Sequence, residues 1–383
     1  MADARISLSV FSVKRATLPF RFRFGHSKTS RGAAETLLLA VSAAHGPAGF
    51  GQVLARTYLS GETLDHASKS LQEKWLPALG TLRFPRAERA WEWLSVLAPL
   101  YQGANTEGGI ASYSAVDVAA IDAVARACRV AGASFWGRAG DATPLVGVIP
   151  TLGPRKASWL VRAYRMLGYR RFKVKVGDDP GLEAARVRAV RKAAGRHAWI
   201  ALDANAAWEP EDARERMKAL LPFRPALVEE PLRNGREPGA LRLFEVETGI
   251  PVMADESLVT LADAERFLAE GGPSWWNLRL AKVGGFSGIA AMGKLAAENG
   301  VNVYGGVLVG ETSALAAASR ACLGLTEFAC MEYGFPRVLL KDDPFRGGPG
   351  GFRGVAGPLR GSAPGLGVKL ATDSVSTFSS QTL

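Results

Sequence analysis

The sequence predicts an α/β protein, a (β/α)8-type TIM barrel preceded by an α+β capping domain. Two observations favour this class. From about residue 145, short apolar runs alternate with helical stretches, which is the pattern of parallel βα units. In addition, charged residues recur at the ends of these runs, at steps of 26 to 28 residues or about one βα unit. Strand ends converge on one mouth in such a barrel, so these charges should form one ring.

The capping domain is predicted over residues 1–140. Apolar or alternating runs indicate strands of an antiparallel sheet at 5–13, 19–25 and 35–43. Helical patterns follow near 62–77, 86–102 and 115–131. Strands that precede helices, rather than alternating with them, are typical of an α+β domain.

The barrel is predicted over residues 141–340. Its strand candidates are the runs LVGVIPTL, RFKVKVG, AWIALDAN, PALVEEP, IPVMADES, WWNLRLAKVGG, VNVYGG and LTEFACMEYG. Helical stretches between them include 180–195, 209–220, 260–270 and 286–299, and the last unit is the least regular. The tail, residues 341–383, is rich in Gly and Pro, and we expect it to pack back on the capping domain as an irregular segment.

The composition excludes several classes of protein. The chain has no apolar run of about 18 residues, and its first residues lack the apolar core of a signal peptide, so we expect no membrane partner. The net charge of +11 is spread along the chain without a basic tract, which argues against nucleic acid. Cys128, Cys322 and Cys330 form neither a disulfide framework nor a metal-ligand pattern. We predict a cytoplasmic homo-oligomer that acts on a small carboxylate substrate.

Three carboxylates end consecutive strand runs, at Asp203, Glu229 and Asp255. Facing one another they would repel strongly unless a cation lay among them. Oxygen ligands in this number suit Mg²⁺, with Mn²⁺ as the alternative. Any one of these residues alone could instead cap the helix that follows it. The same phase in three consecutive units favours the metal site.

Lysines flank the predicted carboxylates. Lys173 and Lys175 alternate in the run YRRFKVKVGDD and therefore point to one face, while Lys282 ends the sixth run and should face them across the mouth. Two adjacent ammonium groups beside a buried face are costly, although such a pair can also snorkel at a surface. Beside a metal-held carboxylate, Lys175 and Lys282 can serve as acid and base, and Lys173 would ease deprotonation of Lys175. The arrangement predicts removal of an α-proton through an enolate intermediate.

These motifs resemble those of the enolase superfamily, specifically its muconate lactonizing (muconate cycloisomerase) subgroup in the mandelate racemase/muconate lactonizing enzyme family. FKVKVG, LDAN, VEEPL, ADES and AKVGG resemble that family's barrel strands, and FRFGHSKTSR and ARTYLSGET resemble its two capping loops. The resemblance covers nearly the whole chain. It implies that Lys175 and Lys282 are the acid/base catalysts, that Lys173 supports Lys175, and that the three carboxylates bind Mg²⁺.

The resemblance also implies further residues around the site. These candidates are Asn205, Glu256, Glu311, Glu332, His26 and Tyr58. Asn205 is expected near the metal and Glu256 beside a lysine. Glu311 either reaches the mouth or caps the following helix. His26 either contacts substrate or orders the first capping loop, and Tyr58 of the second loop is a specificity candidate.

The chain departs from related patterns at three places. Gln52 replaces a Glu in the turn GFGQV, at a position expected to be remote from the chemistry. Cys330 and Glu332 stand where dipeptide epimerases carry Asp-x-Asp to hold the substrate ammonium, which argues against that activity. The late strands contain no histidine, so a mandelate-racemase-like His-Asp base is not expected.

The leading interpretation is a Mg²⁺-dependent, muconate cycloisomerase-like isomerase or lyase. A racemase or epimerase of an N-acyl amino acid or dipeptide, or a syn-dehydratase, would use the same ring. A Schiff-base aldolase would not need three aligned carboxylates. A non-catalytic ligand-binding relative would not need the lysines. The substrate, the direction of reaction and the oligomer size are not specified by these motifs.

Overall fold

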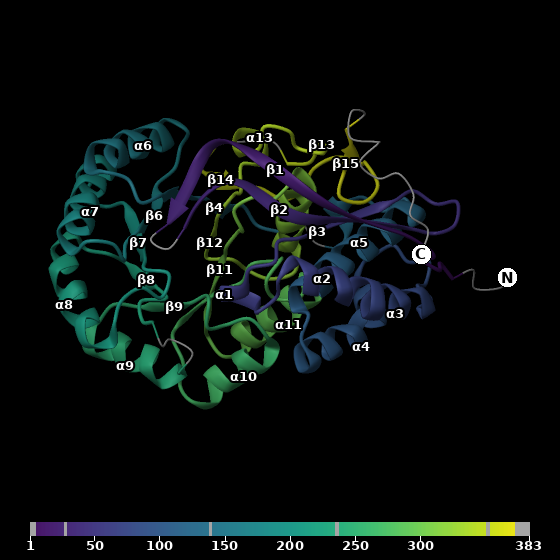
Figure 1. Cartoon of the computed structure of the whole chain (residues 1–383), viewed down its shortest axis with the longest axis horizontal. Coiled ribbons are helices and arrows are strands. Elements are labelled where there is room, and N and C mark those ends of the chain that lie inside the picture. The colour runs from purple at the N-terminus through teal and green to yellow at the C-terminus, as the bar shows by residue number, and fades with distance from the viewer. Residues whose placement is uncertain (1–4, 27–28, 138–139, 234–236, 350–352, 372–383) are drawn as a thin grey trace.

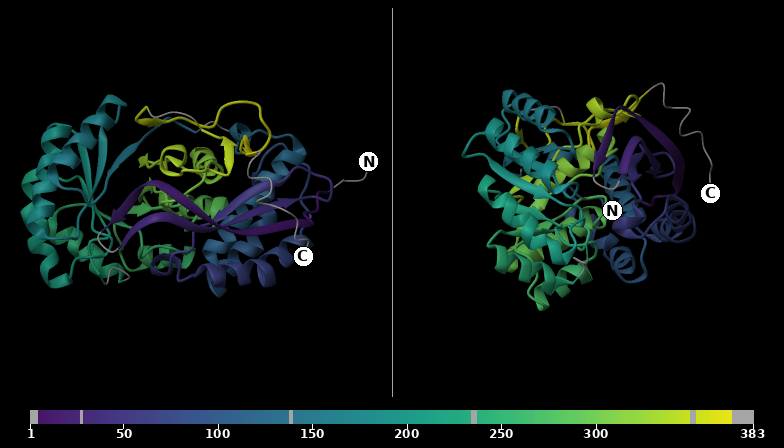
Figure 2. Two further views of the ribbon diagram at one scale, coloured as in Figure 1. Left: turned by 45° about the horizontal axis from the view of Figure 1, so that its top comes forward. Right: turned by 60° about the vertical axis from the view of Figure 1, so that its left-hand side comes forward.

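The computed structural model describes residues 5–26, 29–137, 140–233, 237–349 and 353–371 of the chain. It has two main parts (Figure 1), with the barrel helices α6 to α9 at one end and the capping helices α2 to α5 at the other. The hairpin of β1 (Val10–His26) and β2 (Thr29–Ser42) reaches from the capping part to the barrel (Figures 1 and 2). A backbone bridge between Phe20 and Leu340 fixes that approach.

The capping sheet is antiparallel in the order β1-β2-β3, with β3 at Gly49–Val53. Two predictions about its strands were wrong. The runs at 5–13 and 19–25 are not separate strands, because β1 continues through Pro19 and absorbs the irregularity as a register shift between Pro19 and Phe24. The stretch GFGQV is not a turn but the third strand, because its residues pair with Leu37 to Val41 of β2.

Helices follow this sheet along the chain, and the last of them packs on β2 and β3. They are α1 (Thr57–Ser60), α2 (Leu64–Ser70), a π turn (Leu71–Trp75), α3 (Leu76–Thr81), α4 (Trp91–Glu107) and α5 (Ile110–Cys128). Strand β3 lies so close to α5 that a Cβ at Gly51 would be 2.1 Å from the carbonyl oxygen of Ala115. Only glycine permits this approach, which brings β3 against the helix that leads into the barrel.

Eight parallel strands form the barrel in chain order. They are β5 (Val146–Ile149), β6 (Arg171–Lys175), β7 (Trp199–Asp203), β8 (Leu227–Glu229), β9 (Val252–Ala254), β10 (Trp275–Asn277), β11 (Asn302–Gly305) and β12 (Cys330–Met331). A parallel bridge between Leu145 and Met331 joins the first strand to the last. The predicted (β/α)8 barrel with an antiparallel capping sheet is therefore confirmed.

Helices connect consecutive barrel strands. They are α6 (Pro154–Met166), α7 (Pro180–Ala194), α8 (Pro210–Leu220), α9 (Pro238–Thr248), α10 (Leu261–Ala269), α11 (Gly285–Glu298) and α12 (Ser313–Ala321). Helices α6 to α9 begin with proline, whose missing N–H costs nothing in the first turn. No helix within the described residues has both the length and the apolar character needed to cross a membrane.

The C-terminal segment forms α13 (Pro336–Leu339) and the short strands β13 (Phe345–Gly347), β14 (Val355–Ala356) and β15 (Val368–Leu370). Strand β14 pairs with β4 (Thr143–Pro144), directly before the barrel begins. Further on, the Leu366 backbone N–H donates to Asp122 of α5 at 2.8 Å, and Arg126 of α5 donates to the Val368 carbonyl at 2.8 Å. The segment thus contacts both the capping helix α5 and the start of the barrel.

Gln52 of β3 joins the capping sheet to the barrel. Its buried amide donates to the Gly310 carbonyl at 3.0 Å and accepts from the Thr312 backbone N–H at 2.8 Å and hydroxyl at 3.0 Å. These residues belong to the loop between β11 and α12. The position is therefore less remote than its sequence context suggested, because it holds a loop at the barrel end.

Replacing Gln52 by Ala should destabilise the chain by about 1–3 kcal/mol, because buried backbone groups at Gly310 and Thr312 lose their partner. Urea unfolding measures the change. Gln102→Ala, at an exposed position of α4, is the matched control and should change stability by less than about 0.5 kcal/mol. Equal losses in both variants would contradict the bridging role.

Candidate active site

The strand register brings the predicted charges together at one end of the barrel. Lys175 pairs with Asp203, and Asp203 pairs with Glu229, so the last residues of β6, β7 and β8 lie side by side. Asp255 directly follows β9, and Lys282 lies in the loop between β10 and α11. All five side chains are buried. The carboxyl ends of the strands therefore form the charged ring that the spacing predicts.

The two lysines predicted as catalysts each contact a carboxylate of this ring. Lys175 Nζ lies 2.5 Å from Asp203 Oδ2 and 2.7 Å from Asn205 Oδ1. Lys282 Nζ donates to Asp255 Oδ1 at 3.0 Å and to the carbonyl of Asn277 at 2.7 Å. Strands β6 and β10 are four positions apart in the eight-stranded order, so the lysines approach from opposite sides of the barrel.

Lys173 makes the largest set of ion pairs at this end. Its Nζ lies 2.7 Å from Glu229 Oε2, 2.5 Å from Glu332 Oε1 and 3.4 Å from Asp203 Oδ2. Burial lowers the pKa of Lys173, but Glu229, Glu332 and Asp203 more than offset this and hold it well above the usual value. Lys173 is therefore a fixed cation. The cost of burying it beside Lys175 is offset by carboxylates rather than by exposure to solvent.

The pKa of Lys282 is shifted in the opposite direction from that of Lys173. Burial is the main cause that lowers its pKa below the usual lysine value, and the guanidinium of Arg279 adds to the effect, although Asp255 opposes it. A lower pKa makes the neutral amine, which can accept a proton, more accessible at working pH. The surroundings therefore keep Lys173 protonated and make Lys282 the easier of the two to deprotonate.

The three carboxylates are unequally neutralised. Burial, followed by the charges of Asp203 and Asp255, raises the pKa of Glu229 to about 7. Burial also raises the pKa values of Asp203 and Asp255, but the neighbouring cations reverse this, and both lie below the usual value. Glu229 Oε2 lacks a hydrogen bond of good geometry, although Lys173 Nζ lies 2.7 Å away. Glu229 is therefore the ring carboxylate whose negative charge its surroundings stabilise least.

Arg279 is a residue of the ring that the sequence analysis missed. Its buried guanidinium forms an ion pair with Asp255 and lies 3.4 Å from Glu229 Oε1. Asn277 of β10 also donates to Glu229 Oε1, at 2.8 Å. Both residues precede Lys282 in the run WWNLRLAK, and a second basic residue in that run was the available signal.

As the side chains stand, no three Asp, Glu, His or Cys residues in the described part of the chain are grouped closely enough to hold a metal ion. The ammonium and guanidinium groups lie among the carboxylates instead. The chemistry of the donor set nevertheless fits a divalent cation, because three buried carboxylates come from adjacent strands and the cations beside Glu229 do not fully offset its burial and its acidic neighbours. Asp203, Glu229 and Asp255 are the residues that would hold it.

Arg279 is expected to compete with that cation. Arg279→Met removes the guanidinium from Asp255 and Glu229, so Mg²⁺ should bind about tenfold more tightly. In metal-free buffer the same variant should be less stable by about 3–5 kcal/mol, because Asp255 loses a buried partner. Titration calorimetry and urea unfolding measure the two effects. Arg279→Lys, which keeps the charge, is the control, and weaker Mg²⁺ binding by Arg279→Met would contradict competition.

Asn205 and Glu256 lie beside Lys175. Asn205 Oδ1 accepts from Lys175, and its Nδ2 donates to Glu256 Oε1 at 3.0 Å, so Glu256 connects to a lysine through this amide. Glu230, next to the ring carboxylate, accepts from the backbone N–H of Asp255 at 2.7 Å and thereby orients that loop. Burial and the charge of Asp255 raise the pKa of Glu256 well above its usual value.

The later acidic candidates lie nearby. Glu332 accepts from Tyr304 at 2.9 Å besides pairing with Lys173. Glu311 is buried and accepts from the Leu308 backbone N–H at 2.8 Å, while the N-cap of α12 is Thr312 without a side-chain cap bond. Of its two predicted roles, helix capping is therefore not the one adopted. Burial raises the pKa of Glu311 to about 8, and the charge of Glu332 contributes.

The capping-loop candidates belong to the N-terminal capping part of the chain. Tyr58 is exposed on α1. His26 is the last residue of β1, at the tip of the hairpin, and its side chain lies outside the described part of the structure.

Comparison with known proteins identifies the family. The Enolase C-terminal domain-like family matches residues 157–374.

The chain belongs to the enolase superfamily.

Relatives within this superfamily are enzymes with different activities. The L-Ala-D/L-Glu epimerase of Bacillus subtilis (strain 168) is 25% identical over 340 residues, which cover 88% of this chain and 89% of the relative. The chloromuconate cycloisomerase of Pseudomonas sp. (strain P51) is 28% identical over 216 residues, or 55% of this chain and 58% of the relative. The solved structure of a dipeptide epimerase from Enterococcus faecalis V583, complexed with Mg and L-Leu-L-Tyr, has a TM-score of 0.82 at 21% identity and covers 95% of this chain and 99% of its own. The last comparison supports the fold of this enolase-superfamily enzyme.

Proposed function

We propose that this enolase-superfamily enzyme removes and returns the α-proton of a small carboxylate substrate, with Lys175 and Lys282 as the two proton carriers. The observation that carries the proposal is that both amines contact carboxylates of one ring from opposite sides of the barrel. A substrate between them would present one face of its α-carbon to each amine. Either amine can accept the proton while the other donates one, through an enolate intermediate.

Other residues of the ring prepare this step. Asp203, Glu229 and Asp255 would hold Mg²⁺, or Mn²⁺, which when bound would acidify the α-proton by stabilising negative charge on the substrate carboxylate. Lys173 stays charged and keeps Asp203 and Glu229 in place. Asn205 orients Lys175, and the Asn277 carbonyl orients Lys282. Burial excludes water, which strengthens each of these interactions.

Among the reactions open to this site, we favour racemisation or epimerisation, a 1,1-proton transfer. Two opposed amines are what such a transfer requires, since one face must lose a proton and the other gain one. The epimerase relative also matches much more of the chain than the cycloisomerase relative does. Epimerisation therefore takes precedence over cycloisomerisation here, which reverses the order that the motifs alone suggested.

The residues at the eighth strand favour an N-acyl amino acid whose acyl group carries no ammonium, rather than a dipeptide with a free amino terminus. Cys330 packs inside the barrel with Val146 and Met253, and Glu332 is already paired with Lys173. Neither residue is therefore available to hold a substrate ammonium, which a dipeptide with a free amino terminus would need. An N-acyl amino acid lacks that charge. The same observation keeps a muconate cycloisomerase-like reaction as the second candidate, because muconate also lacks an ammonium group.

Proton exchange in D₂O tests the proposal. The Mg²⁺-loaded chain is incubated with panels of N-acyl amino acids, of dipeptides and with cis,cis-muconate, and NMR follows the α-proton signals while chiral chromatography follows inversion. Exchange and inversion of both enantiomers of an N-acyl amino acid are expected. Conversion of muconate alone would select the second candidate. No exchange with any carboxylate of the panel would contradict both.

A further inference from the structure

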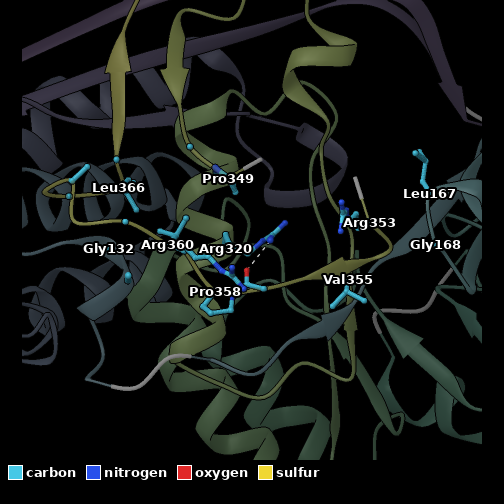
Figure 3. A pocket seen from close by; sticks show the side chains of 18 of the residues that line it. Gly132, Leu167, Gly168, Arg320, Pro349, Arg353, Val355, Pro358, Arg360 and Leu366 are labelled. Atoms are coloured by element: carbon cyan, nitrogen blue, oxygen red, sulfur yellow. Dashed lines mark hydrogen bonds between the residues drawn. The ribbon is translucent and has the colours of Figure 1, made fainter. Parts of the chain in front are cut away.

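A cavity of about 930 Å³ lies away from the charged ring (Figure 3). Its walls are residues 132–133 and 166–168, the end of α12 at Arg320, and parts of the C-terminal segment at 348–349 and within 353–367. Gly168 comes shortly before β6, and Val355 of β14 pairs with Pro144 just before β5. The cavity therefore lies at the amino ends of the barrel strands, opposite the ends that carry Lys175 and Asp203.

The lining of this cavity is positively charged. Arg320, Arg353 and Arg360 contribute to it (Figure 3), and no acidic residue does so within the described chain. Arg353 and Arg360 are exposed, whereas Arg320 is only 6% exposed. The three guanidinium groups extend from different segments, α12 and the C-terminal segment, to one cavity.

Arg320 is a buried cation without an acidic partner in the described structure. Its Nη1 donates to the Gly357 carbonyl at 2.9 Å, and its guanidinium lies 5.6 Å from the ring centre of Tyr333. Both contacts are with uncharged groups, and burial lowers its pKa. A buried charge that no opposite charge balances is costly, and a bound anion would offset that cost.

A second buried polar group without a partner belongs to the residue that follows the lining residue Gly168. Tyr169 follows Gly168 of the lining, is fully buried, and its hydroxyl has no hydrogen-bond partner in the described part of the chain. The hydroxyl is a potential hydrogen-bond donor that no described group uses.

We propose that this cavity binds a small-molecule anion with at least two negative charges, either a phosphate monoester or a dicarboxylate. Arg320 is the buried contact, because its remaining N–H groups can donate to two oxygens at once. Arg353 and Arg360 contribute at the rim, where solvent weakens each interaction. The site is separate from the ring at the other barrel end and does not depend on the reaction catalysed there.

Titration calorimetry on the full chain tests this site, with inorganic phosphate, glycerol 3-phosphate and succinate as probes. One saturable site per chain is expected for at least one probe, and the phosphate and succinate arms distinguish the two sources of charge. Arg320→Met should weaken binding by more than about tenfold. Arg360→Gln should weaken it about threefold, as expected for an exposed contact. Arg155→Gln, at an exposed position of α6 outside the lining, is the matched control and should bind as the wild type does.

Three results would overturn the proposal. One is the absence of saturable binding for all probes. Another is unchanged affinity in both Arg320→Met and Arg360→Gln, with Arg320→Met lowering only thermal stability, which would leave Arg320 as a tether for Gly357. The third is loss of binding in Lys175→Ala, which would place the anion at the charged ring. If Arg320→Met fails to fold, anion binding is measured instead in the Arg353→Gln/Arg360→Gln double variant, because both of these positions are exposed.

Discussion

Replacing Lys282 by alanine is expected to lower turnover by about 10²–10⁴-fold, the usual contribution of a positioned acid or base. Its buried amine, held by Asp255 and the Asn277 carbonyl, has no substitute on its side of the barrel in the described structure. Lys175→Ala should cause a loss of the same size from the opposite side. Initial rates on the substrate found by the exchange panel measure both effects.

The single variants should also differ in which enantiomer they deprotonate. Each keeps one amine, so each should exchange the α-proton of only one enantiomer in D₂O while inversion stops. Lys294→Ala, which removes an exposed lysine paired with Glu298 on α11, is the matched control and should leave turnover unchanged. Circular dichroism checks that the fold persists. Turnover near the wild-type level in either Lys175→Ala or Lys282→Ala would refute the two-amine reaction.

Replacing Asp203 by asparagine is expected to weaken Mg²⁺ binding by about a hundredfold or more. The change removes one anionic oxygen of the predicted ligand set and also the carboxylate 2.5 Å from Lys175. Losses of 10–100-fold are typical even for residues that only support a metal ligand. Calorimetric titration with Mg²⁺ measures the affinity, and thermal unfolding with and without Mg²⁺ measures the linked stabilisation.

The control for the metal prediction is Asp65→Asn. Asp65 is an exposed acid of α2 whose partner is Arg15, so the variant changes the net charge equally without touching the ring. Its Mg²⁺ titration should match that of the wild type. An unchanged titration in Asp203→Asn would remove Asp203 from the ligand set, and an equal loss in both variants would show that overall charge, rather than ligation, determines binding.

Local patterns were enough to predict most of the barrel. Each βα unit carries its own alternation of apolar strand and helical stretch, and five consecutive strand runs are followed or ended by a charged residue. The positions of Lys175, Asp203 and Glu229 therefore followed from spacing alone, because parallel strands place equivalent residues at one end of the sheet. The capping sheet was less predictable, because Pro19 interrupts the alternation of β1 without ending the strand.

By itself, then, the sequence determined that a barrel forms and that Lys175, Asp203, Glu229, Asp255 and Lys282 lie at its mouth, since both depend on periodicities within a few tens of residues. Only the tertiary structure decided how the charges pair: Lys173 with Glu332, Arg279 with Asp255, and Arg320 with no acid in the described chain. Pairing of this kind depends on distances between segments far apart in the chain and on how deeply each group is buried. No local pattern encodes those quantities, because the strength of a charge interaction is set by the surroundings that the whole fold creates.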